Sequence, residues 1–244
     1  MKKIKTEEFD KYVANYDMSD AAIDRKYHHT YRVMENCLKI AECLNLDDDK
    51  KYMAVLCGLL HDIGRFEQWR VYKSYQDWST VDHGDNGVLV LEENNLFERF
   101  EEDPRIKEII LFAIKNHNKR EIEETNDSDK LLITKIIRDA DKIDIILMQH
   151  NELKEGKYPL NEYFLKDLYD GKTCDRSNLQ NEIDHVLAHF GFLFDINYNQ
   201  TFGLIKESNV IDKKFKVLRN SIDDERIDEL EKYINNYIDR KLEE

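Results

Sequence analysis

Apolar residues recur along most of this chain at the three- and four-residue spacing that is typical of amphipathic helices. In the first clear case they stand at positions 27, 31, 34, 38, 41 and 44. The same spacing predicts helices over 27–44, 52–61, 81–96, 106–114, 131–147 and 222–242. The helix at 52–61 is apolar on most of its faces, so we expect it to be central in the fold.

Capping residues mark where some of these helices begin and end. The aspartates at 47–49 can cap the helix at 52–61, and Gly64 is expected to end it. Asp103 followed by Pro104 predicts the start of the helix at 106–114, because aspartate is a good N-cap and proline suits the first turn.

The remaining segments are less regular. Residues 65–80 lack a clean period and predict a loop or a short helix, and 126–129 predict a polar connector. Residues 158–171 are expected to form a helix and a turn. The Ser-x-x-Gln motif at 177–180 is a capping-box pattern that predicts a helix running to residue 194.

These patterns together predict an all-α protein with a single domain. The 244 residues contain only two prolines and eight glycines, so few turns are demanded. No alternating stretch is long enough for a central strand, and we find no internal repeat or linker. A chain of this length can bury a full core without disulfides.

The net charge, the cysteines and the apolar runs limit which partners and which cellular location we expect. The net charge of −14, from 37 basic and 51 acidic residues, makes nucleic-acid binding unlikely. A small anionic substrate still fits if a metal ion inverts the local potential. The four cysteines form no CxxC pair, which argues against a cysteine zinc site or a disulfide framework. The basic N-terminus is not followed by the apolar region of a signal peptide. Apolar runs reach only about eight residues, too few to span a membrane. We therefore expect a cytoplasmic protein with reduced thiols and no membrane contact.

Histidine and aspartate residues recur at predicted helix ends or inside the most apolar helices. They are His29, His61, Asp62, His83, His117 and Asp141. Buried polar groups cost several kcal/mol unless they are paired or bind a metal, so a metal centre is the simplest explanation. Adjacent helical residues diverge by about 100°, so an ion reached by both His61 and Asp62 must lie at a helix end.

Each of these residues has a simpler explanation when it is considered alone. A helical histidine such as His29 is usually a satisfied core or surface residue. His117 ends a predicted helix, where a cationic ring would stabilise the helix dipole. Gly87 shares a helix face with His83 and lets another backbone come near. Three aspartates interrupt the apolar helix at 131–147, and at least one of them needs a cation partner: Asp139, Asp141 and Asp144.

Taken together, the residues favour a metal site. Two histidines and two carboxylates form an N2O2 donor set with room for waters, which suits an octahedral ion better than tetrahedral zinc. If Asp62 bridges, His83 and His117 can hold a second ion. We therefore expect one or two divalent ions per chain, drawn from Mn, Fe, Co, Ni and Mg.

The order H…HD…H…H…D resembles the HD-domain superfamily of metal-dependent phosphohydrolases. The likeness covers about 25–150 and implies an all-α HD core followed by a helical extension over about 151–244. His29 is preferred to His28 because it begins the family's H-x-x-R-V motif, and Asp141 is preferred to Asp139 because Lys142 follows it. By this resemblance the core metal ligands are His29, His61, Asp62 and Asp141.

The two other histidines, His83 and His117, match the extra ligands of binuclear members, such as HD-GYP phosphodiesterases and HD-type diadenosine tetraphosphatases. The GYP signature is absent, which argues against hydrolysis of cyclic di-GMP. The resemblance implies hydrolysis of a phosphomonoester, a phosphodiester or a nucleotide phosphoanhydride by metal-activated water, with His61 and Asp62 at the catalytic centre. The substrate is expected to be a small phosphorylated molecule such as a nucleotide.

Arg65, directly after the HDIG tetrapeptide, is the best candidate for a catalytic contact to phosphate, although a surface arginine beside Phe66 explains it equally well. Weaker cationic candidates are Lys119, Arg120 and Lys142. The aromatic residues Phe66, Trp69, Tyr72, Tyr75 and Trp78 either stack a base or simply pack on the helices. The histidines outside the motif, His150, His185 and His189, are interpreted as structural.

Two other classes of function stay open. Some HD proteins with the same six ligands are di-iron oxygenases, and degenerate HD-like domains act as non-catalytic sensory modules without the full ligand set. Metal content and oxygen consumption separate the first class from a hydrolase.

The apolar stripe that follows Ile222 is an available surface for a homo-oligomer, whose size the sequence leaves open.

Overall fold

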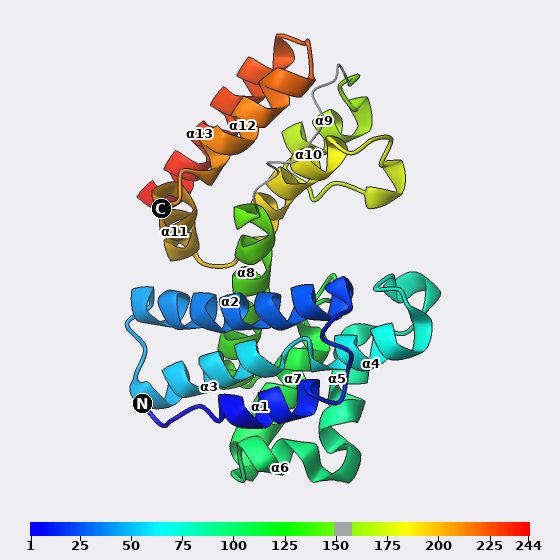
Figure 1. The fold of residues 1–244 in the computed structure, drawn as a ribbon. Coiled ribbons are helices and arrows are strands. Elements are labelled where there is room, and N and C mark those ends of the chain that lie inside the picture. The colour runs from blue at the N-terminus through cyan, green and yellow to red at the C-terminus, as the bar shows by residue number, and fades with distance from the viewer. Residues whose placement is uncertain (149–157) are drawn as a thin grey trace. The chain divides into compact units, whose positions relative to one another are not determined.

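The computed structural model describes residues 1–148 and 158–244, and its regular elements in those ranges are all helical (Figure 1). The described backbone contains no strand, which confirms the all-α prediction. Backbone packing divides the chain into two compact units, Met1–Asp141 and Lys142–Glu244. The single-domain organisation stays a prediction.

The first unit contains seven complete α-helices and the first part of an eighth among its described residues. They are α1 (Thr6–Val13), α2 (Ala21–Cys43), α3 (Asp48–Leu60), α4 (Ile63–Tyr72), α5 (His83–Glu92), α6 (Leu96–Phe100), α7 (Pro104–Asn116) and α8 (Ser128–Leu147). Short 3-10 helices, η1 (Asp77–Ser79) and η2 (Glu93–Asn95), lie on either side of α5. In Figure 1, α1, α2 and α3 lie side by side, and α8 crosses behind α2. The Asn36 amide donates to the carbonyl of Ala140 at 3.3 Å at this crossing.

Two predicted helix starts are confirmed at atomic detail. The Asp47 side chain accepts from the backbone N–H of Lys50 at 2.9 Å and caps α3. Asp103 accepts from the N–H of Arg105 at 2.8 Å and caps α7, with Pro104 in its first turn. Both aspartates satisfy backbone donors that have no partner inside the helix.

Two predicted boundaries are wrong. Gly64 does not end a helix but lies in the first turn of α4, where a Cβ atom would approach the backbone N of Gly87 to 2.5 Å. Glycine is required there by the close crossing of α4 and α5, and a helix end is not involved. Ser177 lies in η3 (Arg176–Asn178), where its N–H donates to the side chain of Asp175, so it is not the N-cap of the following helix.

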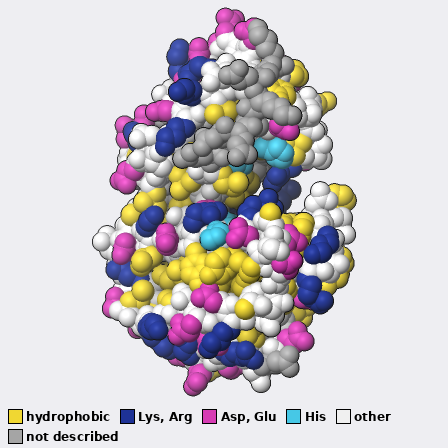
Figure 2. Space-filling view, viewed as in Figure 1, with side chains coloured by type: hydrophobic (Ala, Val, Ile, Leu, Met, Phe, Trp, Pro, Cys, Tyr) yellow, Lys and Arg dark blue, Asp and Glu magenta, His cyan; other side chains and the backbone are white. Residues whose placement is uncertain are grey.

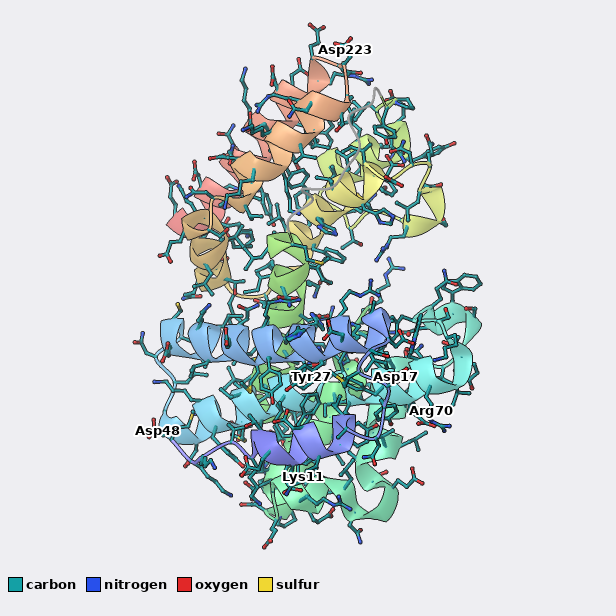
Figure 3. All side chains as sticks on the ribbon, viewed as in Figure 1. Lys11, Asp17, Tyr27, Asp48, Arg70 and Asp223 are labelled. Atoms are coloured by element: carbon teal, nitrogen blue, oxygen red, sulfur yellow. The ribbon has the colours of Figure 1, made fainter. Side chains whose placement is uncertain are left out.

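The 65–80 segment is more helical than a loop, since α4 continues to Tyr72. Helix α1, which the periodicity did not predict, packs against the aromatic residue Phe66 of this segment. Its Phe9 is fully buried, stacks with Tyr27 at 6.1 Å and meets the ring of Phe66 at 5.8 Å. Tyr27, labelled in Figure 3, also donates from its hydroxyl to Asp10 at 3.0 Å. Phe66 is therefore a core residue.

The second unit contains the end of α8 and five further α-helices among its described residues. They are α9 (Glu162–Tyr169), α10 (Asp184–Gly191), α11 (Asn199–Glu207), α12 (Val210–Ser221) and α13 (Arg226–Glu243), with η4 (Phe192–Asp195) after α10. The prediction of a helix and a turn at 158–171 is confirmed by α9 and by Gly171, whose φ is +67°. The apolar stripe of α13 is buried inside this unit, at Ile227, Leu230, Ile234 and Ile238. This stripe is therefore not free to pair with a second copy. A homo-oligomer stays a prediction that the stripe does not support.

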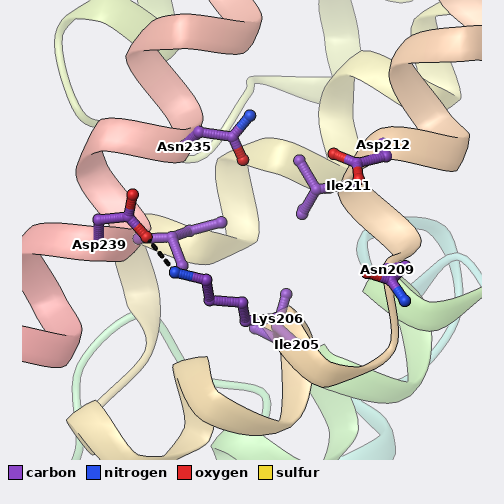
Figure 4. Close-up of a pocket in the computed structure, with 8 residues that line it drawn as sticks. Ile205, Lys206, Asn209, Ile211, Asp212, Asn235 and Asp239 are labelled. Carbon is purple, nitrogen blue, oxygen red and sulfur yellow. Dashed lines mark hydrogen bonds and ion pairs between the residues drawn. The ribbon is translucent and has the colours of Figure 1, made fainter.

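A pocket lies between α11, α12 and α13 (Figure 4). The ion pair between Lys206 and Asp239 spans it at 2.5 Å, and the pocket contains none of the residues predicted to form the metal site. On the face drawn in Figure 2, basic and acidic side chains are intermingled and do not form one extended basic patch.

No helix in the described part of the chain has the length and hydrophobicity that crossing a bilayer requires.

Lys214 of α12 is a buried lysine, and it gives the second unit a pH-dependent stability. Its side chain is 2% exposed and donates to the carbonyl of Met148 at 2.8 Å. Its Nζ also lies 3.1 Å from Nδ1 of His189. Burial lowers the pKa of Lys214 from its ordinary 10.5 to about 7. Between these two values the unfolded chain binds more protons than the folded chain, so stability rises with pH across this window.

We expect Lys214→Met to flatten this rise and to stabilise the protein near pH 6 by roughly 2–4 kcal/mol, because methionine keeps the apolar stem and removes the buried charge. Thermal and urea unfolding at pH 6, 8 and 10 measure the effect. Lys216→Met, an exposed change on the same helix, is the control. A variant with the pH profile of the parent protein would contradict this assignment.

Candidate metal centre

Helix ends position four of the six predicted ligands. His61 follows the last residue of α3, and Asp62 is the N-cap of α4. His83 is the first residue of α5, and His117 directly follows α7. The two others, His29 and Asp141, project from α2 and α8. All six belong to the first unit.

Close backbone contacts bring these helix ends together. Gly87 has no side chain between α5 and the backbone around His61 and Gly64, and a Cβ atom there would lie 3.8 Å from the His61 carbonyl oxygen and from the Gly64 nitrogen. The predicted role of Gly87 is thus confirmed. After α7, Arg138 donates to the carbonyl oxygens of Asn116 at 3.2 Å and Lys119 at 2.5 Å. These bonds fix the turn that carries His117.

One half of the cluster faces Oδ2 of Asp62. His29 Nε2 lies 3.5 Å from this oxygen and 3.1 Å from Oδ1 of Asp141. His61 Nε2 lies 3.6 Å from Asp62 Oδ2 and 3.9 Å from Asp141 Oδ1. Two imidazole nitrogens and two carboxylate oxygens therefore converge within a space that suits one ion.

The other half faces Oδ1 of Asp62. His83 Nε2 lies 3.6 Å from Oδ1, and His117 Nε2 lies 3.9 Å from it. The two Nε2 atoms are 3.0 Å apart, so both can reach one ion at the roughly 2.1 Å of a metal–imidazole bond. Each oxygen of Asp62 thus has two histidine nitrogens within 3.9 Å, and His61, Asp62 and His117 form a further group that could hold a metal ion.

The hydrogen bonds of the ring nitrogens leave the Nε2 lone pairs directed at the cluster. His61 Nδ1 donates to the carbonyl of Gly58 at 2.8 Å, and His117 Nδ1 donates to the carbonyl of Ile114 at 2.6 Å. The Nε2 atom of His61 is buried and has no hydrogen-bond partner among residues 1–148 and 158–244. A buried acceptor of this kind needs an explanation, and a metal ion provides one.

The charges of the cluster also fit a divalent cation. Burial lowers the pKa of His61, and burial together with His83 lowers the pKa of His117 to about 3, so both rings are neutral near pH 7. The alternative in which a cationic His117 stabilises its helix end is therefore disfavoured. Burial alone would raise the pKa of Asp62, but the Lys26 ammonium outweighs it and holds that pKa well below its usual range. The same balance, with His29 as the main opposing partner, lowers the pKa of Asp141.

Arg65 is held against the cluster and is not a surface residue beside Phe66. Its guanidinium donates to Asp77 Oδ1 at 2.7 Å, to the carbonyl of Tyr75 at 2.8 Å and to Gln68 at 2.8 Å. One terminal nitrogen lies 3.4 Å from His83 Nε2, and Nε lies 3.5 Å from Asp62 Oδ1. These contacts place a fixed positive charge beside the second pair of histidines.

Two residues of this site were missed by the sequence analysis. Lys26 lies one helical turn before His29, and its Nζ is 2.6 Å from Asp62 Oδ2. Asp77 accepts from Nδ1 of His83 at 2.5 Å and from Arg65. The i−3 spacing of Lys26 from His29 was a usable signal, because both then share one helix face. Asp77 stands in an irregular segment and gave no such signal.

Asp77 orients His83, since a carboxylate on the far nitrogen of a ligating ring fixes its tautomer and raises its basicity. We expect Asp77→Asn to weaken metal binding at the second pair of histidines about 10–100-fold. Titration with Mn²⁺, followed by isothermal calorimetry, measures this change. Asp49→Asn, at an exposed position in the first turn of α3, should leave the affinity unchanged. Equal affinities in both variants would contradict the role of Asp77.

The other candidates have different partners. Lys119 pairs with Asp82 at 2.7 Å and Asp85 at 2.9 Å, and Arg120 is exposed. Lys142 belongs to the second unit and pairs with Asp195 at 2.8 Å. His185 and His189 also belong to the second unit, and His150 lies outside the described residues. None of these described side chains is among the groups that could hold a metal ion.

The aromatic residues of this segment differ in burial and in their contacts. Phe66 is buried in the core, and Trp69 donates its indole N–H to Asp20 at 2.7 Å. Tyr72 and Trp78 are exposed, and the indole of Trp78 is 85% accessible. Tyr75 lies under Arg65, with 5.6 Å between the guanidinium carbon and the ring centroid.

The chain is similar in part to known proteins. The chain is similar to a solved structure titled as a predicted HD superfamily hydrolase from an uncultured Thermotogales bacterium, at 20% identity and a TM-score of 0.42. The similarity covers 83% of this chain and 90% of that chain. No curated protein matches the chain. Residues 27–146 match the HD domain, and this range contains all six candidate ligands in the expected order. Residues 27–146 therefore form an HD domain, and the cluster of histidine and aspartate side chains lies within it.

Proposed function

We propose that this protein is a metal-dependent phosphohydrolase that acts on a small phosphorylated substrate. The observation that carries the proposal is the position of Asp62, whose two carboxylate oxygens face two different pairs of histidines at 3.5–3.9 Å. Such a carboxylate suits a pair of divalent ions, and paired ions are typical of enzymes that displace groups at phosphorus.

The residues divide into two sets of ligands around Asp62. His29, His61 and Asp141 would hold one ion with Oδ2, and His83 and His117 would hold the second with Oδ1. When bound, such ions lower the pKa of a coordinated water and stabilise negative charge on a phosphoryl group. Manganese, iron, cobalt, nickel and magnesium all fit this mixed nitrogen and oxygen donor set.

The chain itself supplies the orientation of the reacting groups. Hydrogen bonds to Gly58 and Ile114 hold the rings of His61 and His117 so that Nε2 faces inward. Arg65 is clamped by Asp77, so its guanidinium needs no reordering to bind a phosphoryl oxygen. Its remaining N–H donors lie beside Asp62 and His83, where charge on the substrate would develop.

The overall charge favours a small substrate over a polymer. At a net charge of −14 the surface repels a polyanion, whereas a local pair of divalent ions attracts a single phosphorylated molecule. Phosphomonoesters, phosphodiesters and nucleotide phosphoanhydrides all share the phosphoryl group that this site is suited to bind.

A panel of these three substrate classes, assayed with each of the five metals, tests the proposal. We expect phosphate release or ester cleavage with at least one metal, together with stoichiometric metal in the purified protein. Oxygen consumption by an iron-loaded sample without any phosphohydrolysis would instead assign an oxygenase. Failure of every metal to bind or to raise the melting temperature would assign a non-catalytic module.

A further inference from the structure

Three cationic side chains converge on the ring of Tyr75, next to the proposed metal centre. The cationic groups of Arg25, Lys26 and Arg65 lie 6.0, 5.6 and 5.6 Å from the ring centroid. Among the described residues these cations pair with two carboxylates, Asp62 beside Lys26 and Arg65, and Asp77 beside Arg65. Three cations against two carboxylates leave a local excess of positive charge in a chain whose net charge is −14, which indicates a binding function.

The ring beneath these cations is held in place. The Tyr75 hydroxyl donates to the carbonyl of Ala22 at 2.9 Å, in the first turn of α2. The ring of Trp69 lies 4.9 Å from it, and the Trp69 indole is anchored by Asp20. Tyr75 is therefore a fixed platform for the cations above it.

The three cations differ in how they are neutralised. Arg65 is bonded to Asp77, and Lys26 is paired with Asp62 Oδ2 at 2.6 Å. Arg25 is exposed, and no carboxylate of the described residues forms an ion pair with it. Lys26 has only one carboxylate partner in the described chain, and that partner is a proposed metal ligand.

Lys26 and a metal ion therefore compete for the same oxygen. Asp62 Oδ2 is also the oxygen that faces His29 and His61, so an ion bound there takes the position that the ammonium group now neutralises. An ion on this oxygen would repel the ammonium and would itself neutralise Asp62. The ammonium, on a flexible four-carbon stem, would then be available to a second anion.

We propose that Arg25, Lys26 and Arg65 around Tyr75 form a second anion subsite, and that Lys26 moves from Asp62 to the bound anion when the metal site is loaded. This inference rests on the proposed function, because it places the subsite next to a phosphoryl group held by the ions. The substrate class that fits is a phosphoanhydride, in which two phosphates are adjacent. One phosphate lies on the ions and the other lies among the three cations.

The first test measures metal affinity and does not depend on turnover. Lys26→Met removes the competing charge, so we expect Mn²⁺ to bind about 10-fold more tightly in calorimetric titration. Lys26→Arg restores a competing cation and should return the affinity towards that of the parent protein. Lys39→Met, at an exposed position of the same helix roughly 20 Å away, is the matched control.

The second test measures anion binding with imidodiphosphate, a diphosphate that resists hydrolysis, and with inorganic phosphate. Both are titrated into Mn²⁺-loaded protein, and the heat of Mn²⁺ chelation in the absence of protein is subtracted. We expect Lys26→Met and Arg25→Gln each to weaken imidodiphosphate binding about 10-fold and to change phosphate binding less than about twofold. Arg25→Gln is exposed and should leave Mn²⁺ affinity unchanged.

The outcomes separate this inference from the proposed function. If Mn²⁺ binds and phosphate esters are hydrolysed, but Lys26→Met changes neither Mn²⁺ nor imidodiphosphate affinity, the subsite is refuted and the function stands. If both affinities change as expected but no phosphate compound is hydrolysed, the subsite stands and the hydrolase is refuted. Equal loss of phosphate and imidodiphosphate binding in Arg25→Gln would also overturn the subsite.

Discussion

Asp62→Ala is expected to lose bound metal and phosphohydrolase turnover together. Asp62 is the only described side chain whose oxygens face both pairs of histidines, so its removal deprives both proposed ions of a ligand. It also removes a negative charge that would balance the two ions. We expect turnover to fall at least about 1000-fold, since metal ions contribute several kcal/mol to such reactions. Metal analysis of the purified variant and a phosphoester assay measure the two losses.

We expect Asp62→Ala to fold like the parent protein, so that a loss of metal or turnover is not caused by unfolding. Asp62 is the N-cap residue of α4, but its side chain makes no capping hydrogen bond, so the start of the helix does not depend on it. Circular dichroism of the metal-free variant should therefore match that of the metal-free parent. Asp49→Ala, an exposed change near the start of α3, is the matched control. Full activity or full metal content in Asp62→Ala would refute the metal centre.

Helices with an amphipathic pattern were predictable from the sequence, whereas their close contacts were not. The spacing over 27–44 and the cap at Asp47 depend on local chemistry, and α2 and α3 follow them. Gly64 was assigned to a helix end because glycine often ends helices. Its actual role depends on the approach of Gly87 from another helix, and a contact of this kind cannot be deduced from local sequence.

The order of histidines and aspartates identified six residues that the fold brings close together. Five of the six candidates are buried, and Asp141 is partly exposed at its edge. The choice of Asp141 over Asp139 depended on the family resemblance, and in the structure Asp141 is the aspartate that lies 3.1 Å from His29. Periodicity alone could not have made this choice, because all three aspartates of that helix interrupt the same apolar pattern.

The supporting residues were harder to predict because they act through pairs of contacts. Asp77 lies in an irregular segment, and its importance follows only from its bonds to His83 and Arg65. Lys26 looks like an ordinary charge on an amphipathic helix until Asp62 is placed beside it. Candidate metal ligands are therefore easier to find in a sequence than the residues that orient these ligands or pair with them.

His117→Gln is expected to reduce the metal content from two ions per chain to one and to lower turnover about 100-fold or more. His117 Nε2 lies 3.0 Å from His83 Nε2 and 3.9 Å from Asp62 Oδ1, whereas His29 contacts Asp62 through Oδ2. Its loss should empty only the second of the two proposed positions, because the first keeps its four donors. Metal analysis at saturating Mn²⁺ and calorimetric stoichiometry measure the change.

Asp141→Asn completes this comparison, because Asp141 contacts the first position and not the second. Its Oδ1 lies near His29 and His61, so the variant should also retain one ion, bound by His83, His117 and Asp62. The two single variants should then differ in which ion remains, and the double variant should bind none. If the parent protein binds one ion at saturation and His117→Gln still binds one, the second pair of histidines is not a metal site. The 3.0 Å contact between His83 and His117 would then require a shared proton, because each ring already donates from Nδ1.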